Sequence, residues 1–183
     1  MANALTGVRL LLVLPFAVLM AQGDARSAGL AALALAASIA TDLLDGPVAR
    51  RRGTVTAASA AFDHTTDCLF VTSGLAAGAV RGAFPWILPA LVAAAFTQYV
   101  VDSYWLHREG RLRTSRLGRY NGVLYFVPLA GDILIRLGLP ALGPLVGIIA
   151  WGLVASTVLS MLERVALARR RRAHLGGPAE RRT

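Results

Sequence analysis

The sequence predicts an all-α integral membrane protein with six transmembrane helices and a short N-terminal interfacial segment. Of its 183 residues, 56% are hydrophobic, and the mean hydropathy is +0.58. These values are too apolar for an ordinary soluble domain of this size. Apolar runs of about 20 residues, the length that crosses a bilayer as a helix, recur along the chain. All 19 basic residues are arginines, and most lie in the polar stretches between apolar runs.

The expected spans alternate with short polar turns and arginine-rich loops. The opening NALTGVR is polar enough to lie in the membrane interface before the first span, which Pro15 is expected to bend. Pro47 removes a backbone donor near the end of the second span, and Pro128 interrupts the fifth. The six spans cover roughly Leu5–Ala21, Ala28–Ala49, Ala57–Val80, Trp86–Leu106, Tyr120–Leu137 and Leu145–Ala168.

These spans form one membrane domain over residues 1–168, followed by a basic tail over residues 169–183. The tail is polar and expected to be disordered, and its arginines would lie on anionic lipid headgroups. The first span lacks a basic n-region and a clear cleavage site, so we expect a retained helix. The single cysteine, Cys68, excludes an intramolecular disulfide.

Arginine placement predicts the topology. With six spans, both termini lie on the same side of the membrane. Arg50–Arg52, the five-arginine loop (107–119) and the tail are on this side as well. Arg26, Arg81 and Arg136 are on the opposite side. The positive-inside rule makes the arginine-rich side cytoplasmic. We therefore expect a multi-pass protein of the cell (inner) membrane with both termini and the site described next facing the cytoplasm. A net charge of +9 can also suggest nucleic acid, but this placement favours membrane topology and no nucleic-acid partner.

Four aspartates give the strongest functional signal. Asp42 and Asp45 are three residues apart, and Asp63 and Asp67 are four apart, so on helices each pair shares one face. Both pairs fall at the cytoplasmic ends of spans two and three. Four carboxylates in a small volume repel one another and call for cations, and hard oxygen ligands suit Mg²⁺ or Mn²⁺.

Neighbouring residues suggest what such a cation would do. Arg50 lies near a site that would hold phosphate, and Gly46 lets another group approach the backbone closely. Metal, arginine and glycine together suggest phosphoryl transfer, with the metal neutralising a diphosphate. One alternative is that the aspartates pair structurally with Arg50–Arg52. A second is a divalent-cation transporter, which would carry its acids near mid-bilayer with a path to both faces.

The run from Thr41 to Asp67 resembles the signature of the CDP-alcohol phosphotransferase family, D-x2-D-G-x2-A-R-x8-G-x3-D-x3-D. Seven of the eight specified positions agree. Ser59 stands at the remaining one, where the family has its second glycine, and an inactive family member is therefore a further alternative. The opening NALTGVR is similar to the N-LT-xxR start common in the family. With the six-helix layout, it extends the resemblance over most of the chain.

The resemblance implies a metal-dependent transferase. Asp42, Asp45, Asp63 and Asp67 would bind two divalent ions, Mg²⁺ or alternatively Mn²⁺. Asp67 would also be the base that takes the proton of the acceptor hydroxyl. The alcohol oxygen would attack the β-phosphorus of CDP-diacylglycerol and release CMP. The residues implied to hold the CDP part are Gly46, Ala49, Arg50 and Ser59, with Thr6 and Asn3 near the nucleotide.

A second group of residues bears on the acceptor. Arg113, Arg116 and Arg119 have a three-residue spacing that would place them on one helical face to bind a phosphate. The alternative is that these charges only hold the loop inside. Arg119 in LGRYNG resembles the basic position before helix five in phosphatidylglycerophosphate and phosphatidylinositol-phosphate synthases. The preferred acceptor is therefore glycerol 3-phosphate, then inositol phosphate, then serine or another unphosphorylated alcohol.

Three further features have structural interpretations. His64 lies between the motif acids but is expected to point off their face and to be structural. Asp132 and Arg136 are one turn apart in span five and are expected to form an internal ion pair. The small-residue run GLAAG (74–78) predicts close helix packing, either within one chain or in a homodimer.

Overall fold

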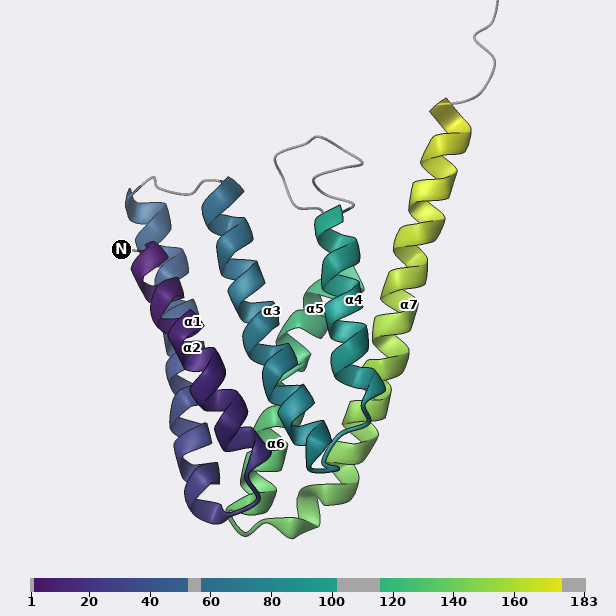
Figure 1. Ribbon diagram of the computed structural model, residues 1–183. Coiled ribbons are helices and arrows are strands. Elements are labelled where there is room, and N and C mark those ends of the chain that lie inside the picture. The colour runs from purple at the N-terminus through teal and green to yellow at the C-terminus, as the bar shows by residue number, and fades with distance from the viewer. Residues whose placement is uncertain (1, 53–56, 102–115, 176–183) are drawn as a thin grey trace, which may run out of the picture.

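Helices make up almost all of the described residues in this computed structural model (Figure 1). The structure describes residues 2–52, 57–101 and 116–175, with side chains over 6–43, 61–101, 117–118 and 120–167. No strand occurs in these ranges, so the predicted all-α class is confirmed. The helices are α1 (Ala2–Ala21), α2 (Ala25–Arg52), α3 (Ala57–Val80), α4 (Ile87–Val101), α5 (Arg116–Leu124), α6 (Phe126–Arg136), the 3-10 turn η2 (Pro140–Leu142) and α7 (Gly143–Leu175).

The helix bounds match the predicted spans best in the middle of the chain. Helix α3 has the predicted bounds. Helix α2 continues through Pro47 and ends at Arg52. The opening NALTGVR forms the start of α1 and is not a separate element, while its place in the membrane interface stays a prediction. Helix α7 runs to Leu175, beyond the domain boundary expected at Ala168. Residues 102–106 of the fourth predicted span lie outside the described residues.

The fifth predicted span consists of two helices, α5 and α6, which follow one another along the bundle (Figure 1). The break falls at Tyr125, whose backbone N–H still donates to the Asn121 carbonyl at 3.0 Å. Pro128, the expected interruption, lies in the first turn of α6 and has no N–H to donate to the carbonyl of Leu124, where α5 ends, so the predicted break is confirmed. Its missing N–H costs nothing there, because the first N–H groups of a helix have no intrahelical acceptor.

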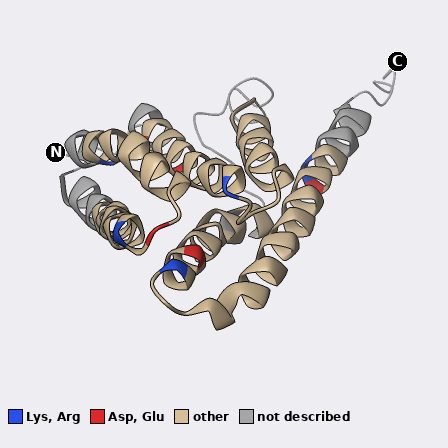
Figure 2. Cartoon of the chain, turned by 60° about the horizontal axis from the view of Figure 1, so that its bottom comes forward, with Lys and Arg blue, Asp and Glu red and all other residues tan. Residues whose placement is uncertain are grey.

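Within the part of the chain that the structure describes, two stretches of helix are long and apolar enough to cross a membrane. They are Ala25–Leu43 and Pro140–Leu167, with mean hydropathies of 1.2 and 2.1. Thr6–Ala21 and Ile87–Val101 are apolar but shorter. Figure 2 shows few charged residues along the described helices. These features agree with a membrane protein, while six crossings stay a prediction.

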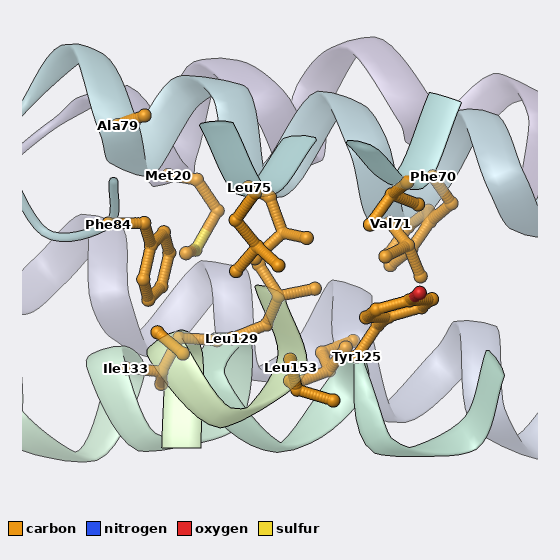
Figure 3. Packing of buried hydrophobic residues seen from close by; sticks show 14 of the residues in the cluster. Met20, Phe70, Val71, Leu75, Ala79, Phe84, Tyr125, Leu129, Ile133 and Leu153 are labelled. Atoms are coloured by element: carbon orange, nitrogen blue, oxygen red, sulfur yellow. The ribbon is translucent and has the colours of Figure 1, made fainter. Parts of the chain in front are cut away.

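The core cluster draws buried residues from α1, α2, α3, α4, α6 and α7, and Figure 3 shows part of it. The rings of Phe16 and Phe70 stack with their centroids 4.3 Å apart, joining α1 to α3. Gly74 makes this approach possible, since a Cβ there would clash with Phe16. Gly78 likewise gives room to the ring of Phe84. The small-residue run therefore packs within the chain, as one of its two interpretations predicted.

Buried charges stabilise one end of the bundle. Asp132 is buried and pairs with Arg136 at 3.2 Å, which confirms the predicted ion pair, and also with Arg81 at 2.6 Å. Arg81 Nε donates to the Met20 carbonyl at 3.1 Å, and Arg136 donates to the Gln22 carbonyl at 2.9 Å. The two arginines thus satisfy carbonyls at the C-terminus of α1, where positive charge is favourable.

Several helix ends that flank arginine-rich stretches of the sequence lie at the other end of the bundle. The N-terminus of α1, the C-terminus of α2, the N-terminus of α3, and the C-termini of α4 and α7 lie at this end, at the top of Figure 1. The turns after α1, α3 and α6 lie at the opposite end (Figure 1). The described helix ends next to the segments predicted to be cytoplasmic are therefore together in space.

Candidate active site

Three of the four predicted aspartates meet at the arginine-rich end of the bundle. Asp42 comes from α2, whereas Asp63 and Asp67 lie one turn apart on α3. One carboxylate oxygen of each residue lies within 4.8 Å of the other two. Their side chains are 53%, 29% and 28% exposed, respectively. The predicted convergence of α2 and α3 is thus present for these three; the side chain of Asp45 lies outside the described part of the chain.

Arg9 of α1 lies against all three carboxylates. Its guanidinium is 3.0 Å from Asp63 and 3.3 Å from Asp42, and it also contacts Asp67. The Arg9 side chain is completely buried. The Thr6 hydroxyl, one turn earlier on α1, donates to Asp63 at 3.4 Å. The polar opening of the chain is therefore part of the site.

The charge and donor chemistry of this cluster fit a divalent cation. Three carboxyl groups lie against one guanidinium, so acidic groups outnumber basic ones among these four side chains. All the carboxylate donors are hard oxygens, which suit Mg²⁺ or Mn²⁺. Each carboxylate has two oxygens, and the three Arg9 contacts all use Oδ1. Ligand capacity remains for a metal ion.

A cavity of about 540 Å³ lies beside the three aspartates and extends between α2, α3, α4, α5 and α7. Its polar lining beyond the aspartates includes Ser38, His64, Tyr99, Asn121, Thr157, Ser160 and Arg164. Its apolar lining includes Ile39, Leu43, Val71, Val92, Phe96, Val123 and Phe126. The cavity can thus hold a molecule with both polar and apolar parts.

Two buried polar groups in the cavity wall have unused hydrogen-bonding capacity among the described residues. Asn121 is 2% exposed, and its Oδ1 accepts a 2.7 Å hydrogen bond from Ser156 Oγ. Its Nδ2 has no hydrogen-bond partner there, and neither has the hydroxyl of Ser38 on α2. Because buried polar groups are normally paired, both groups are candidates to bind a substrate.

Aromatic contacts order the far wall. The guanidinium of Arg164 on α7 lies over the Tyr99 ring of α4, 5.1 Å from its centroid. His64 lies with its ring edge-on to Tyr99 at 6.3 Å. His64 was expected to be structural and to point away from the face of the aspartates. Its contact with an aromatic ring fits a structural residue. It also lines the cavity.

The model of the CDP-alcohol phosphatidyltransferase family matches residues 1–162. The chain belongs to the CDP-alcohol phosphatidyltransferase family. Comparisons with curated proteins and with solved structures found no match. Members of the family are membrane-associated phosphotransferases that move a phosphatidyl group from a CDP-alcohol to an acceptor and use a divalent metal.

The region matching the phosphatidyltransferase family contains Arg9, the three aspartates and every residue that lines the cavity except Arg164. Membership therefore agrees with the resemblance seen in the motif between Thr41 and Asp67. It agrees also with the two helices that are apolar enough to cross a membrane.

Most of the predicted nucleotide and acceptor residues of this phosphatidyltransferase, and the predicted metal ligand Asp45, lie on helical stretches whose side chains are not described. The helical residues concerned are Asn3 on α1, Asp45, Gly46, Ala49 and Arg50 on α2, Ser59 on α3, and Arg116 and Arg119 on α5. Arg113 lies outside the described residues altogether. Their roles stay predictions.

Sequence reasoning missed Arg9, Asn121 and Arg164 as site residues. Arg9 occupies the arginine position of the family's N-LT-xxR start, so its signal was present but had no role attached. Arg164 lies near the end of a long apolar helix, where an ionisable residue is itself a functional signal. Asn121 gave no signal of its own, because its place in the cavity depends on how α5 packs against α7.

Proposed function

We propose that the protein transfers the phosphatidyl group of CDP-diacylglycerol to glycerol 3-phosphate and releases CMP. The transfer chemistry follows from family membership. The observation that carries the assignment of the site is the convergence of Asp42, Asp63 and Asp67 beside a cavity with polar and apolar walls. In this proposal Asp45 completes the metal-binding set.

The aspartates would hold two Mg²⁺ ions, with Mn²⁺ as an alternative, and bound metal neutralises the diphosphate of the donor. Asp67 takes the proton of the acceptor hydroxyl. The acceptor oxygen forms a bond to the β-phosphorus as the bond from this phosphorus to the bridging oxygen breaks. CMP leaves with that oxygen. Asp67 suits the base because it lies in the cavity wall, where an acceptor can reach it.

The nucleotide would lie along the motif residues of α2 and α3. Gly46, Ala49 and Arg50 follow the spacing of the family motif, and Ser59 occupies its second glycine position. Asn3 and Thr6 would lie nearby on α1. Thr6 has a described contact with Asp63, so in this proposal it also supports the metal-binding carboxylates.

The donor is a lipid, and the cavity wall supports this part of the proposal. Ile39 and Leu43 of α2 and Val123 of α5 line the cavity and are also exposed on the outside of the bundle. The apolar wall therefore continues onto the surface that would face the bilayer. Acyl chains could remain in the membrane while the polar head of the same molecule reaches the aspartates.

The acceptor is proposed to bind between α5 and α7. Arg164 places a positive charge in the cavity, and Asn121 offers an amide N–H. A phosphorylated acceptor has both an anionic group and hydroxyl oxygens for these donors. Arg113, Arg116 and Arg119 would add charge at the start of α5, whose next turns line the cavity. Inositol phosphate is the second candidate acceptor, and serine the third.

The proposed location is the cell (inner) membrane, with several crossings and with both termini and the aspartates on the cytoplasmic side. Its support is that the C-termini of α2, α4 and α7, each next to an arginine-rich stretch of the sequence, lie at the same end of the bundle (Figure 1). The small-residue run GLAAG (74–78) no longer supports a homodimer, because Gly74 and Gly78 pack inside the protomer. The transporter alternative loses support because the family consists of phosphotransferases.

An acceptor panel tests the proposal. Purified protein with CDP-diacylglycerol and Mg²⁺ would be given glycerol 3-phosphate, inositol phosphate or serine, and CMP release measured. We expect release with glycerol 3-phosphate alone. Release with only another alcohol would keep the reaction class and refute the acceptor. No release with any alcohol from folded protein would favour the inactive alternative raised by Ser59.

A further inference from the structure

We infer that Arg9 is a positioning residue that holds the metal-binding carboxylates together and turns one oxygen of each toward the cavity. The inference rests on the proposed metal role of the aspartates and adds a residue to which the motif gives no part. Arg9 would act through Asp42, Asp63 and Asp67 and would itself touch neither metal nor substrate.

The geometry places Arg9 behind the carboxylates. Asp42, Asp63 and Asp67 line the cavity, whereas Arg9 is not part of its lining among the described residues. Arg9 is also fully buried, while the aspartates are partly exposed. The guanidinium therefore approaches from the protein interior. Substrate and metal would approach from the cavity.

The atoms involved support the same arrangement. Arg9 contacts Oδ1 of each aspartate, using Nη1 for Asp63 and Asp67 and Nη2 for Asp42. The two terminal nitrogens of a planar guanidinium thus fix three carboxylates in orientation. The Oδ2 atoms are then available to ligate a metal. Proteins commonly tune metal affinity through hydrogen bonds from neighbouring groups that orient the metal-ligating side chains.

Arg9 also joins three helices that would otherwise repel at this point. It lies on α1, Asp42 lies on α2, and Asp63 and Asp67 lie on α3. Three carboxylates within 4.8 Å of one another disfavour close packing of α2 and α3 unless a cation lies among them. The guanidinium supplies that cation before any metal arrives, so the site is partly organised in advance.

In the opposite role, Arg9 would compete with the metal: its guanidinium would occupy the metal position and would have to move away before a metal could bind. The two roles predict opposite effects of removing it. A competitor's removal would tighten metal binding. A positioning residue's removal would weaken it, because the carboxylates would repel and lose their orientation.

Binding of Mn²⁺ alone to full-length protein in detergent micelles separates these roles. Free Mn²⁺ would be followed by electron paramagnetic resonance for the wild type, Arg9→Met and Arg9→Lys. The matched control is Arg136→Met, which removes a buried arginine paired with Asp132 at the other end of the bundle. Circular dichroism would verify that each variant remains helical.

We expect Arg9→Met to bind Mn²⁺ roughly 10–100-fold more weakly than the wild type, the usual cost of losing an outer-shell partner. Arg9→Lys should fall in between, since it keeps the charge but not the planar fork. Arg136→Met should bind like the wild type. If Arg9→Met does not fold, weaker binding by Arg9→Lys carries the inference, and wild-type binding by Arg9→Lys refutes it.

Unchanged or tighter Mn²⁺ binding by folded Arg9→Met would overturn the inference while leaving the proposed function intact. A wild type that binds no Mn²⁺ would contradict the metal site itself and this inference with it. Equal weakening by Arg136→Met would show a general loss of structure and would likewise overturn the specific role of Arg9.

Discussion

Ser156 of α7 donates a 2.7 Å hydrogen bond to Asn121 Oδ1 of α5 and so fixes the amide plane of a side chain that is almost fully buried. The amide nitrogen of Asn121 is then left in the cavity wall without a hydrogen-bond partner among the described residues. A group held in this way is preorganised to donate to a bound molecule. In the proposed function that molecule is the acceptor.

Replacing Asn121 by alanine should therefore raise the KM for the acceptor by roughly 3–10-fold, the value of one hydrogen bond. The KM for CDP-diacylglycerol should change little. Initial rates of CMP release, with each substrate varied in turn, measure both constants. Ser156→Ala is the matched control and should have a smaller effect, because it frees the amide without removing it. Equal changes in both KM values would refute the assignment to the acceptor.

Replacing the arginines proposed to bind the acceptor phosphate should also raise the KM for the acceptor. Arg116→Ala, Arg119→Ala and Arg164→Met should each raise the acceptor KM more than the donor KM, since each removes a positive charge proposed to bind phosphate. Arg26, an exposed residue near the start of α2, provides the control as Arg26→Ala. Small and equal changes for Arg116 and Arg119 would mean that these two only fix the topology.

The contact of α1 with α3 depends on Gly74. A Cβ at this position would clash with the ring of Phe16, so Gly74→Ala should lower the free energy of unfolding by about 1–3 kcal/mol. Thermal unfolding in detergent, followed by circular dichroism, measures the loss. Gly29→Ala is matched to it, because a Cβ there meets nothing within 4 Å. That control should be neutral or stabilising, and equal destabilisation of both variants would contradict the packing argument.

The buried ion cluster at the other end should matter for stability and not for chemistry. Asp132→Asn leaves Arg81 and Arg136 without their anion, which should destabilise the fold by about 3–5 kcal/mol. The turnover rate per folded molecule should stay near the wild-type value. Unfolding measurements and active-fraction assays on the same preparation separate the two effects. A large fall in turnover by fully folded protein would instead connect Asp132 to catalysis.

The sequence allowed the aspartate site to be predicted because its pattern is local. Asp63 and Asp67 share a face through helical spacing alone, and α3 has the bounds expected from the sequence. The contribution of Arg9 could not be derived in that way. It contacts residues 33 to 58 positions further along the chain, and only the packing of three helices reveals it.

The break in the fifth predicted span followed from the sequence, whereas its tertiary contacts did not. Pro128 cannot donate to the Leu124 carbonyl, and the helix breaks one turn before this proline, at Tyr125. The hydroxyl of Tyr125 lies 2.7 Å from that of Thr157 on α7, a tertiary contact that no local pattern encodes. Likewise, the pairing of Asp132 with Arg136 followed from one turn of helix, whereas its pairing with Arg81 did not.

The most direct test of the central claim is metal-dependent CMP release by the wild type and by Asp67→Asn. With CDP-diacylglycerol, glycerol 3-phosphate and Mg²⁺, the wild type should release CMP, and a chelator should stop it. Asp67→Asn should remain helical and lose turnover by at least about 100-fold, the scale of a positioned general base. Turnover by folded Asp67→Asn at the wild-type rate would contradict Asp67 as the base and the placement of the reaction at these three aspartates.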